Sequence, residues 1–292
     1  MYLSLDSSML WNEYCLIRFV VVHRGRGLTI AWKVIKHASS TVAYADYKVL
    51  LTQAAARVPA SVAVVVLADR GFVQTELMDA VDQLGWSYRI RLKVGSWLKR
   101  NGHGWCQVKD FHLGAGEALM LHTVRLHKGT GFGPVHLALA RHPNGEFWAV
   151  LSNQKTTLKS FQEYGWRFNI EESFLDDKSN GFELERSQIR DAQMLERLCF
   201  VLAVATLYLT AQGIEVVETG NRQQVDVHWL RGNSYLRIGW DWIRRALIEP
   251  QKLLANVRFR GHFNTDPVVP SLKYLMDKFK LEFTARTLAY PE

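Results

Sequence analysis

Residues 61–68 read SVAVVVLA, a continuous apolar run that is rich in β-branched side chains. Such a run predicts a strand that is buried on both faces of a sheet. Outward from it, residues 1–35 alternate as three strands, and helical spacing marks 41–57 and 74–84 on either side of the run. A further strand is expected at 87–93. This order predicts an α/β fold with a mixed sheet flanked by helices.

The segment 94–157 has a different character. Short alternating stretches are separated by glycine-rich turns, which predicts strands. We therefore expect an all-β insertion at 94–157 in a discontinuous core made of 1–93 and 158–261. Helical spacing returns in three segments of the second part, at 158–178, 187–212 and roughly 239–256.

The chain has 292 residues, of which 48% are hydrophobic and 22% charged, a balance typical of a soluble globular protein. Its formal net charge of +8 favours a polyanionic partner, with nucleic acid ahead of a membrane surface. Three widely spaced cysteines argue against a disulfide scaffold or zinc finger and favour a reducing cytosol. No signal peptide is recognisable, and the apolar stretch 198–211 is shorter than the about 20 residues that span a bilayer. We expect a cytoplasmic protein without a membrane segment.

Two aspartates lie where predicted strands end. Asp6 closes the first strand, and Asp69 follows the run 61–68. In open α/β sheets this edge faces a crevice in which ligands bind. A single aspartate there is explained as well by capping the next turn. Two on neighbouring strands could jointly hold a divalent cation, which prefers oxygen ligands.

Four polar side chains share one face of the helix expected at 158–178. They are Tyr164, Arg167, Glu171 and Lys178. Their spacings of +3, +4 and +7 confine them to about 60° of a helix surface. The plain alternative is a solvated face with an Arg167–Glu171 pair one turn apart. The combination is rare by chance, about 0.002 per chain of this composition, which favours a functional face.

These residues resemble a known family. The stretch LSLDSS around Asp6, the stretch LADRGF around Asp69 and the pattern Tyr164-x2-Arg167-x3-Glu171-x6-Lys178 are similar to the signature of DDE transposases of the insertion sequence four family. The resemblance implies a ribonuclease-H-like fold with an all-β insertion before the Glu-bearing helix. It implies a catalytic, metal-binding triad of Asp6, Asp69 and Glu171 that holds two Mg²⁺ or Mn²⁺ ions. Tyr164, Arg167 and Lys178 would then hold the DNA backbone.

The resemblance also implies a reaction and its partners. The expected activity is metal-dependent phosphoryl transfer on double-stranded transposon ends and target DNA, through strand nicking, hairpin formation and strand transfer. Paired cations can activate the attacking oxygen and stabilise the leaving one in such displacements. A homodimer in a synaptic complex and a prokaryotic, nucleoid-associated location are further implications.

Basic residues cluster where DNA would lie. Between residues 83 and 109 there are six Lys or Arg and no acid, and segment 222–262 has eight basic residues against three acidic ones. Such surfaces neutralise phosphates without reading sequence, although ordinary solubilising charge explains any single lysine. Trp105 and Trp148 are candidates for stacking on a flipped base, and each is alternatively a core residue. The expected basic DNA contacts are Arg70, Arg89, Arg91 and Lys93.

The chain departs from the family pattern at its start. Relatives carry an N-terminal DNA-binding region ahead of the first catalytic strand, whereas Asp6 is almost the first residue here. We therefore expect that region to be absent and recognition of transposon ends to be weak. At the other end of the chain, we expect a C-terminal extension at 262–292. Two alternatives are a truncated, non-catalytic DNA-binding remnant of a transposase and a ribonuclease-H-like nuclease without strand transfer. The four-residue signature disfavours the second.

Overall fold

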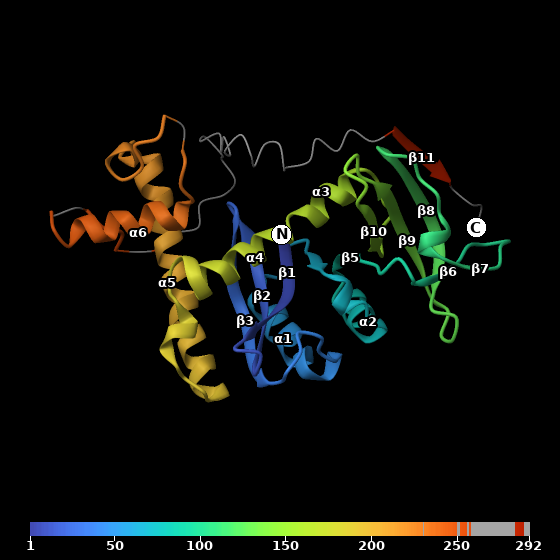
Figure 1. Cartoon of the computed structure of the whole chain (residues 1–292), viewed down its shortest axis with the longest axis horizontal. Coiled ribbons are helices and arrows are strands. Elements are labelled where there is room, and N and C mark those ends of the chain that lie inside the picture. Colours follow the sequence, from blue (N-terminus) through green and yellow to red (C-terminus); the bar gives the residue numbers. More distant parts are fainter. Residues whose placement is uncertain (230, 250–251, 256, 258–283, 289–292) are drawn as a thin grey trace. The chain divides into compact units, whose positions relative to one another are not determined.

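The computed structural model describes residues 1–229, 231–249, 252–255, 257 and 284–288 (Figure 1). The chain forms two compact units, one made of Met1–Glu196 with Leu281–Glu292 and the other of Arg197–Lys280. The described strands all belong to the first unit: β1 (Tyr2–Leu10), β2 (Tyr14–His23), β3 (Arg26–Lys36), β4 (Val65–Ala68), β5 (Ser87–Arg91), β6 (Trp97–Lys99), β7 (Trp105–Gln107), β8 (Glu117–Leu126), β9 (Phe132–Arg141), β10 (Phe147–Ser152) and β11 (Thr284–Leu288).

These strands form one mixed sheet in the order β3-β2-β1-β4-β5-β10-β9-β8-β6-β7, with β11 paired to β8. The first three strands are antiparallel, and β1, β4 and β5 run parallel to one another. This confirms the expected fold class, an α/β mixed sheet flanked by helices of the ribonuclease-H-like type. The apolar run predicted as a strand pairs only over Val65–Ala68, between β1 and β5.

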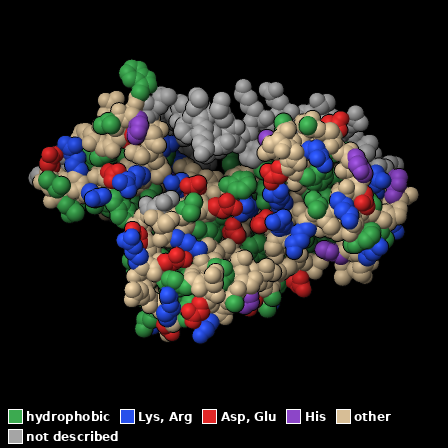
Figure 2. Space-filling model, viewed as in Figure 1, with side chains coloured by type: hydrophobic (Ala, Val, Ile, Leu, Met, Phe, Trp, Pro, Cys, Tyr) green, Lys and Arg blue, Asp and Glu red, His purple; other side chains and the backbone are tan. Residues whose placement is uncertain are grey.

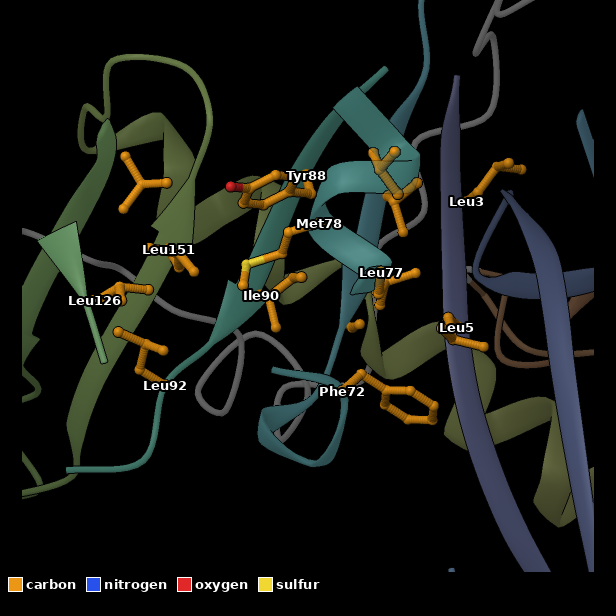
Figure 3. Close-up of a cluster of buried hydrophobic side chains, with 14 of the residues drawn as sticks. Leu3, Leu5, Phe72, Leu77, Met78, Tyr88, Ile90, Leu92, Leu126 and Leu151 are labelled. Carbon is orange, nitrogen blue, oxygen red and sulfur yellow. The ribbon is translucent and has the colours of Figure 1, made fainter. Parts of the chain in front are cut away.

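One face of the sheet carries the main core. The helices α1 (Tyr44–Arg57) and α2 (Thr75–Gln83) pack there, and Leu77 and Met78 of α2 belong to the same buried cluster as Leu3 and Leu5 of β1 (Figure 3). Because side chains alternate along a strand, Ser4 and Asp6 must project to the opposite face. The apolar alternation of β1 therefore decides which face receives the carboxylate.

The segment 94–157 is built of strands, with the short 3₁₀ turn Val108–Asp110 between β7 and β8. Its strands extend the same sheet, because β10 pairs antiparallel with β5 through Val150 and Leu151. The strand β11 pairs in parallel with β8. Apart from 284–288, the C-terminal extension expected at 262–292 lies outside the described residues.

Two short helices replace the single helix expected at 158–178. They are α3 (Lys159–Gly165) and α4 (Phe168–Leu175), followed by a π-helical turn at Asp176–Asn180. α3 contacts β4, β5 and β10, and α4 contacts β1, β2 and β3, so both lie on the face opposite α1 and α2 (Figure 1). The 3₁₀ turns Arg70–Phe72 and Leu184–Ser187 complete the first unit.

The second unit is helical in its described part. α5 (Ala192–Glu218) continues into it from the first unit, and it also contains a 3₁₀ turn at Arg222–Gln224 and α6 (Tyr235–Ala246). Glycines let α5 and α6 touch, because a Cβ on Gly213 would lie 1.8 Å from the Tyr235 carbonyl oxygen. A Cβ on Gly239 would lie 1.9 Å from the Leu209 carbonyl oxygen.

The helix α5 extends beyond the apolar stretch 198–211 at both ends. Among the described helices, it alone has the length and apolar composition that could cross a membrane. The sequence-based expectation that this stretch is too short therefore does not hold for the helix as formed. The property is weak evidence for a membrane, because core helices of soluble proteins share it.

Candidate active site

Asp6 and Asp69 lie at equivalent places on neighbouring parallel strands. The register pairs Leu5 of β1 with Ala68 of β4, so Asp6 and Asp69 are the residues that come next. Asp69 follows the end of β4, as expected, whereas β1 continues to Leu10, so Asp6 lies in the middle of its strand and does not close it. Asp69 leads into the 3₁₀ turn Arg70–Phe72, and its side chain makes no capping hydrogen bond there. The capping explanation for this aspartate therefore has no support. Asp69 lies directly after the C-terminal end of β4.

A buried guanidinium joins Asp6 to Glu171. Arg167 lies between α3 and α4 and is 5% exposed. Its Nη1 donates to Asp6 Oδ2 at 2.8 Å, and its Nη2 donates to Glu171 Oε1 at 2.6 Å. Asp6 and Arg167 are thus in contact although they are 161 positions apart in sequence.

Asp6 has a perturbed carboxyl group in this cluster. Burial raises the pKa of Asp6 to about 6, and the negative charges of Glu171 and Asp69 add to the effect. The Arg167 charge and a hydrogen bond from the Ser7 backbone N–H, at 2.8 Å, oppose it. The pKa of Asp6 is therefore raised mainly by burial and further by two neighbouring acids, as is common at functional sites.

The donor set suits a hard divalent cation in its chemistry. Asp6, Asp69 and Glu171 offer only carboxylate oxygens, the ligands that Mg²⁺ and Mn²⁺ prefer. In the described part of the chain, no three His, Cys, Asp or Glu side chains are arranged closely enough to hold a metal ion. A cation already lies between two of these carboxylates, namely the guanidinium of Arg167.

The other signature residues bind within the protein. Tyr164 is fully buried, its hydroxyl accepts from Arg167 Nε at 3.1 Å, and its ring meets that of Trp148. Lys178 is partly buried and donates to the Met9 carbonyl oxygen at the end of β1. We expected Tyr164, Arg167 and Lys178 to hold the DNA backbone. In this structure the side chain of each has a partner within the protein.

The two candidate tryptophans lie in different surroundings. Trp148 on β10 is 3% exposed and packs between Tyr164, Phe168 and the guanidinium of Arg91. Trp105 on β7 is only partly buried. Trp148 is therefore packed in the core, which was the alternative for either residue, whereas Trp105 is partly exposed.

The expected basic contacts also divide. Arg70 and Lys93 are exposed, and Arg91 is partly buried beside Glu146. Arg89 is 6% exposed and belongs to the interior. Its guanidinium forms an ion pair with Glu163 at 2.8 Å and donates hydrogen bonds to neighbouring oxygens. On the face shown in Figure 2, Lys, Arg and His side chains gather at the right, where segment 94–157 lies.

In segment 222–262, residues 230, 250–251, 256 and 258–262 lie outside the described part. Several arginines in the remainder pair with acids one helical turn away. These pairs are Arg222–Asp226, Arg237–Asp241 and Arg245–Glu249. The excess of positive charge counted from the sequence is therefore partly neutralised within this segment.

The sequence reasoning missed a set of contacts that anchors α4. Ser173 Oγ accepts from the Gly27 backbone N–H at 2.8 Å, and Arg26 Nε donates to Asp176 at 2.7 Å. Next to them, Arg18 forms a buried ion pair with Asp177. The turn at 23–27, which could be taken for a phosphate contact, thus fixes the helix that carries Glu171. The unusual concentration of Arg and Gly at 24–27 was its only sequence signal.

Comparison with solved structures finds a likeness to the cryo-EM structure of the piggyBac transposase synaptic complex with hairpin DNA, with a TM-score of 0.48 and 10% sequence identity. The likeness covers 86% of this chain and 55% of that one, so this chain spans about half the length of that protein. No curated protein matches the chain.

A family model, the transposase DDE domain, matches residues 12–208. The matched stretch contains most of the mixed sheet, Asp69, and the helix pair that carries Arg167 and Glu171. It covers more than half of the chain. The chain therefore belongs to the transposase DDE domain family.

Proposed function

We propose that this chain is the catalytic domain of a DNA transposase encoded by an insertion sequence of the insertion sequence four family. One observation carries the proposal: Asp6, which precedes the family-matching stretch 12–208, and Glu171, which lies within it, meet at one buried arginine with Asp69 nearby. Glu171 and Asp69 add to the ionisation cost of the buried Asp6 carboxyl, and a perturbed acid beside further acids suggests a site kept for binding cations.

The proposed roles follow from the side-chain chemistry. Asp6, Asp69 and Glu171 would hold Mg²⁺ or Mn²⁺, as two ions, which supply charge stabilisation for phosphoryl transfer. Exposed Arg70 and Lys93 would contact phosphates, and so would the partly buried Arg91, the last residue of β5. Arg89 is left out of this set because Glu163 binds it in the interior.

The proposed reaction has three stages on DNA. Water attacks the phosphate at a transposon end, the freed 3′-hydroxyl attacks the opposite strand to form a hairpin, and strand transfer follows hairpin opening. The core of 1–93 and the helices from 158 onward would carry this chemistry. The insertion at 94–157 would contact DNA, with Trp105 better placed than buried Trp148 to stack on a flipped base. We further propose a homodimer in the synaptic complex and action on nucleoid DNA in the cytoplasm.

The test is a nicking assay on supercoiled and oligonucleotide duplex DNA with Mg²⁺ or Mn²⁺. We expect cleavage by the wild-type chain and none by D69N or E171Q, with DNA affinity in gel shifts equal or higher because each variant removes a negative charge. K48Q, which alters an exposed lysine on α1, on the opposite face of the sheet from α3 and α4, is the control for a single charge change. DNA binding without cleavage by the wild-type chain would favour the alternative of a non-catalytic, DNA-binding remnant.

A further inference from the structure

Arg167 binds two carboxylates of the candidate site and lies in the protein interior. Its side chain is 6% exposed, and each of its donor nitrogens has an acceptor: Asp6, Glu171 and the Tyr164 hydroxyl. Its planar group also lies 4.8 Å from the centre of the Phe168 ring. The guanidinium is thus already held by three groups of the protein itself.

We propose that Arg167 is a built-in cation that holds Asp6 and Glu171 in the metal-free protein and competes with divalent metal ions for them. The inference rests on the proposed function, because it takes these two carboxylates as metal ligands. Three acids without a cation would repel one another in a partly buried site, and one guanidinium offsets part of that repulsion. Arg167 is thus a positioning residue that closes the site until metal arrives.

The geometry indicates how the contact would open. Arginine does not lose its proton in proteins, so the release must come from movement of a side chain. The Glu171 side chain is 49% exposed, whereas that of Asp6 is 16% exposed. Water can replace the arginine at Glu171 far more easily than at Asp6. Glu171 is therefore the carboxylate expected to leave Arg167 first.

The test measures metal binding without DNA and without catalysis. Mn²⁺ is titrated into the full chain, and free Mn²⁺ is followed by its electron paramagnetic resonance signal. We expect R167Q to bind Mn²⁺ about tenfold or more tightly than wild type, the factor that corresponds to one charged hydrogen bond to a competing group. R167K, whose single ammonium cannot bridge both carboxylates as a planar fork does, should fall between the two. K48Q should bind as wild type does.

A second variant guards against misfolding of R167Q. Tyr164→Phe removes the hydroxyl that anchors Arg167 Nε and touches neither carboxylate, so Mn²⁺ should bind about twofold to tenfold more tightly, the factor of one ordinary hydrogen bond. Weaker Mn²⁺ binding in R167Q and Y164F would show that Arg167 preorganises the ligands, and unchanged binding would show that it does not compete. Either result overturns the inference. D69N separates this failure from that of the proposed function, because unaltered Mn²⁺ binding in D69N would contradict the metal site itself.

Discussion

Replacing Asp6 by Asn should change how the stability of the metal-free protein depends on pH. The Asp6 carboxyl titrates near 3.8 when unperturbed, and burial among other acids raises its pKa in the folded chain to about 6. A group with a raised folded pKa contributes stability that is fully present below its unfolded pKa and is lost as the pH rises through the folded one. At 1.36 kcal/mol per pH unit, the ionised carboxylate costs the fold about 3 kcal/mol above pH 6.

The assay is urea unfolding in EDTA at pH values from 4 to 7.5. The difference in free energy of unfolding between wild type and D6N should fall by about 3 kcal/mol across this range, since only the wild-type carboxyl ionises. E146Q provides a control of opposite sign. Although burial alone would raise the pKa of Glu146, hydrogen bonds and charge from Arg91 lower it overall, so its contribution is lost as the pH falls. A wild-type-to-D6N difference that stays level or rises with pH would refute the reasoning.

Three further predictions concern the interior, the α4 anchor and the DNA surface. Arg89→Ala leaves Glu163 as a buried carboxylate without its main partner, and should lower the free energy of unfolding by about 3–5 kcal/mol in urea titrations. Gly27→Ala would bring a Cβ within 2.6 Å of a valine methyl on β2, and should cost about 1–3 kcal/mol, seen as a lower Tm. Changing exposed Lys93 and Lys99 together to Ala should reduce the slope of log affinity against log salt by about 0.9 for each phosphate that the protein no longer neutralises, measured by gel shift on random duplex.

The strand and helix order could be predicted because it depends on local patterns. The β-branched run at 61–68 and the alternation of β1 are each patterns of residues that are close together in sequence. Both predict strands, and β4 and β1 form in the sheet. The all-β character of 94–157 followed from its glycine-rich turns in the same way. The pairing of β11 with β8 had no such signal, because a short strand is stabilised by a partner far away in sequence.

The side-chain environment could be predicted only in part. The pair of Arg167 and Glu171 one turn apart, which the sequence offered as the plain alternative to a functional face, is present. The helical stripe could not show that Arg167 also reaches Asp6, since that contact depends on how α4 lies across β1. Likewise, an arginine such as Arg89 is expected at the surface from its residue type. It is buried in an ion pair because α3 places Glu163 beside it.

The central claim is that Asp6, Asp69 and Glu171 share one metal site, and iron-mediated backbone cleavage tests it most directly. Fe²⁺ replaces Mg²⁺ in the purified chain, ascorbate and peroxide generate hydroxyl radicals at the bound ion, and mass spectrometry maps the breaks. The account predicts breaks near residues 6, 69 and 171 together, all suppressed by excess Mg²⁺ and all weakened in D69N. Breaks confined to one of these positions, or breaks elsewhere that D69N leaves unchanged, would contradict it.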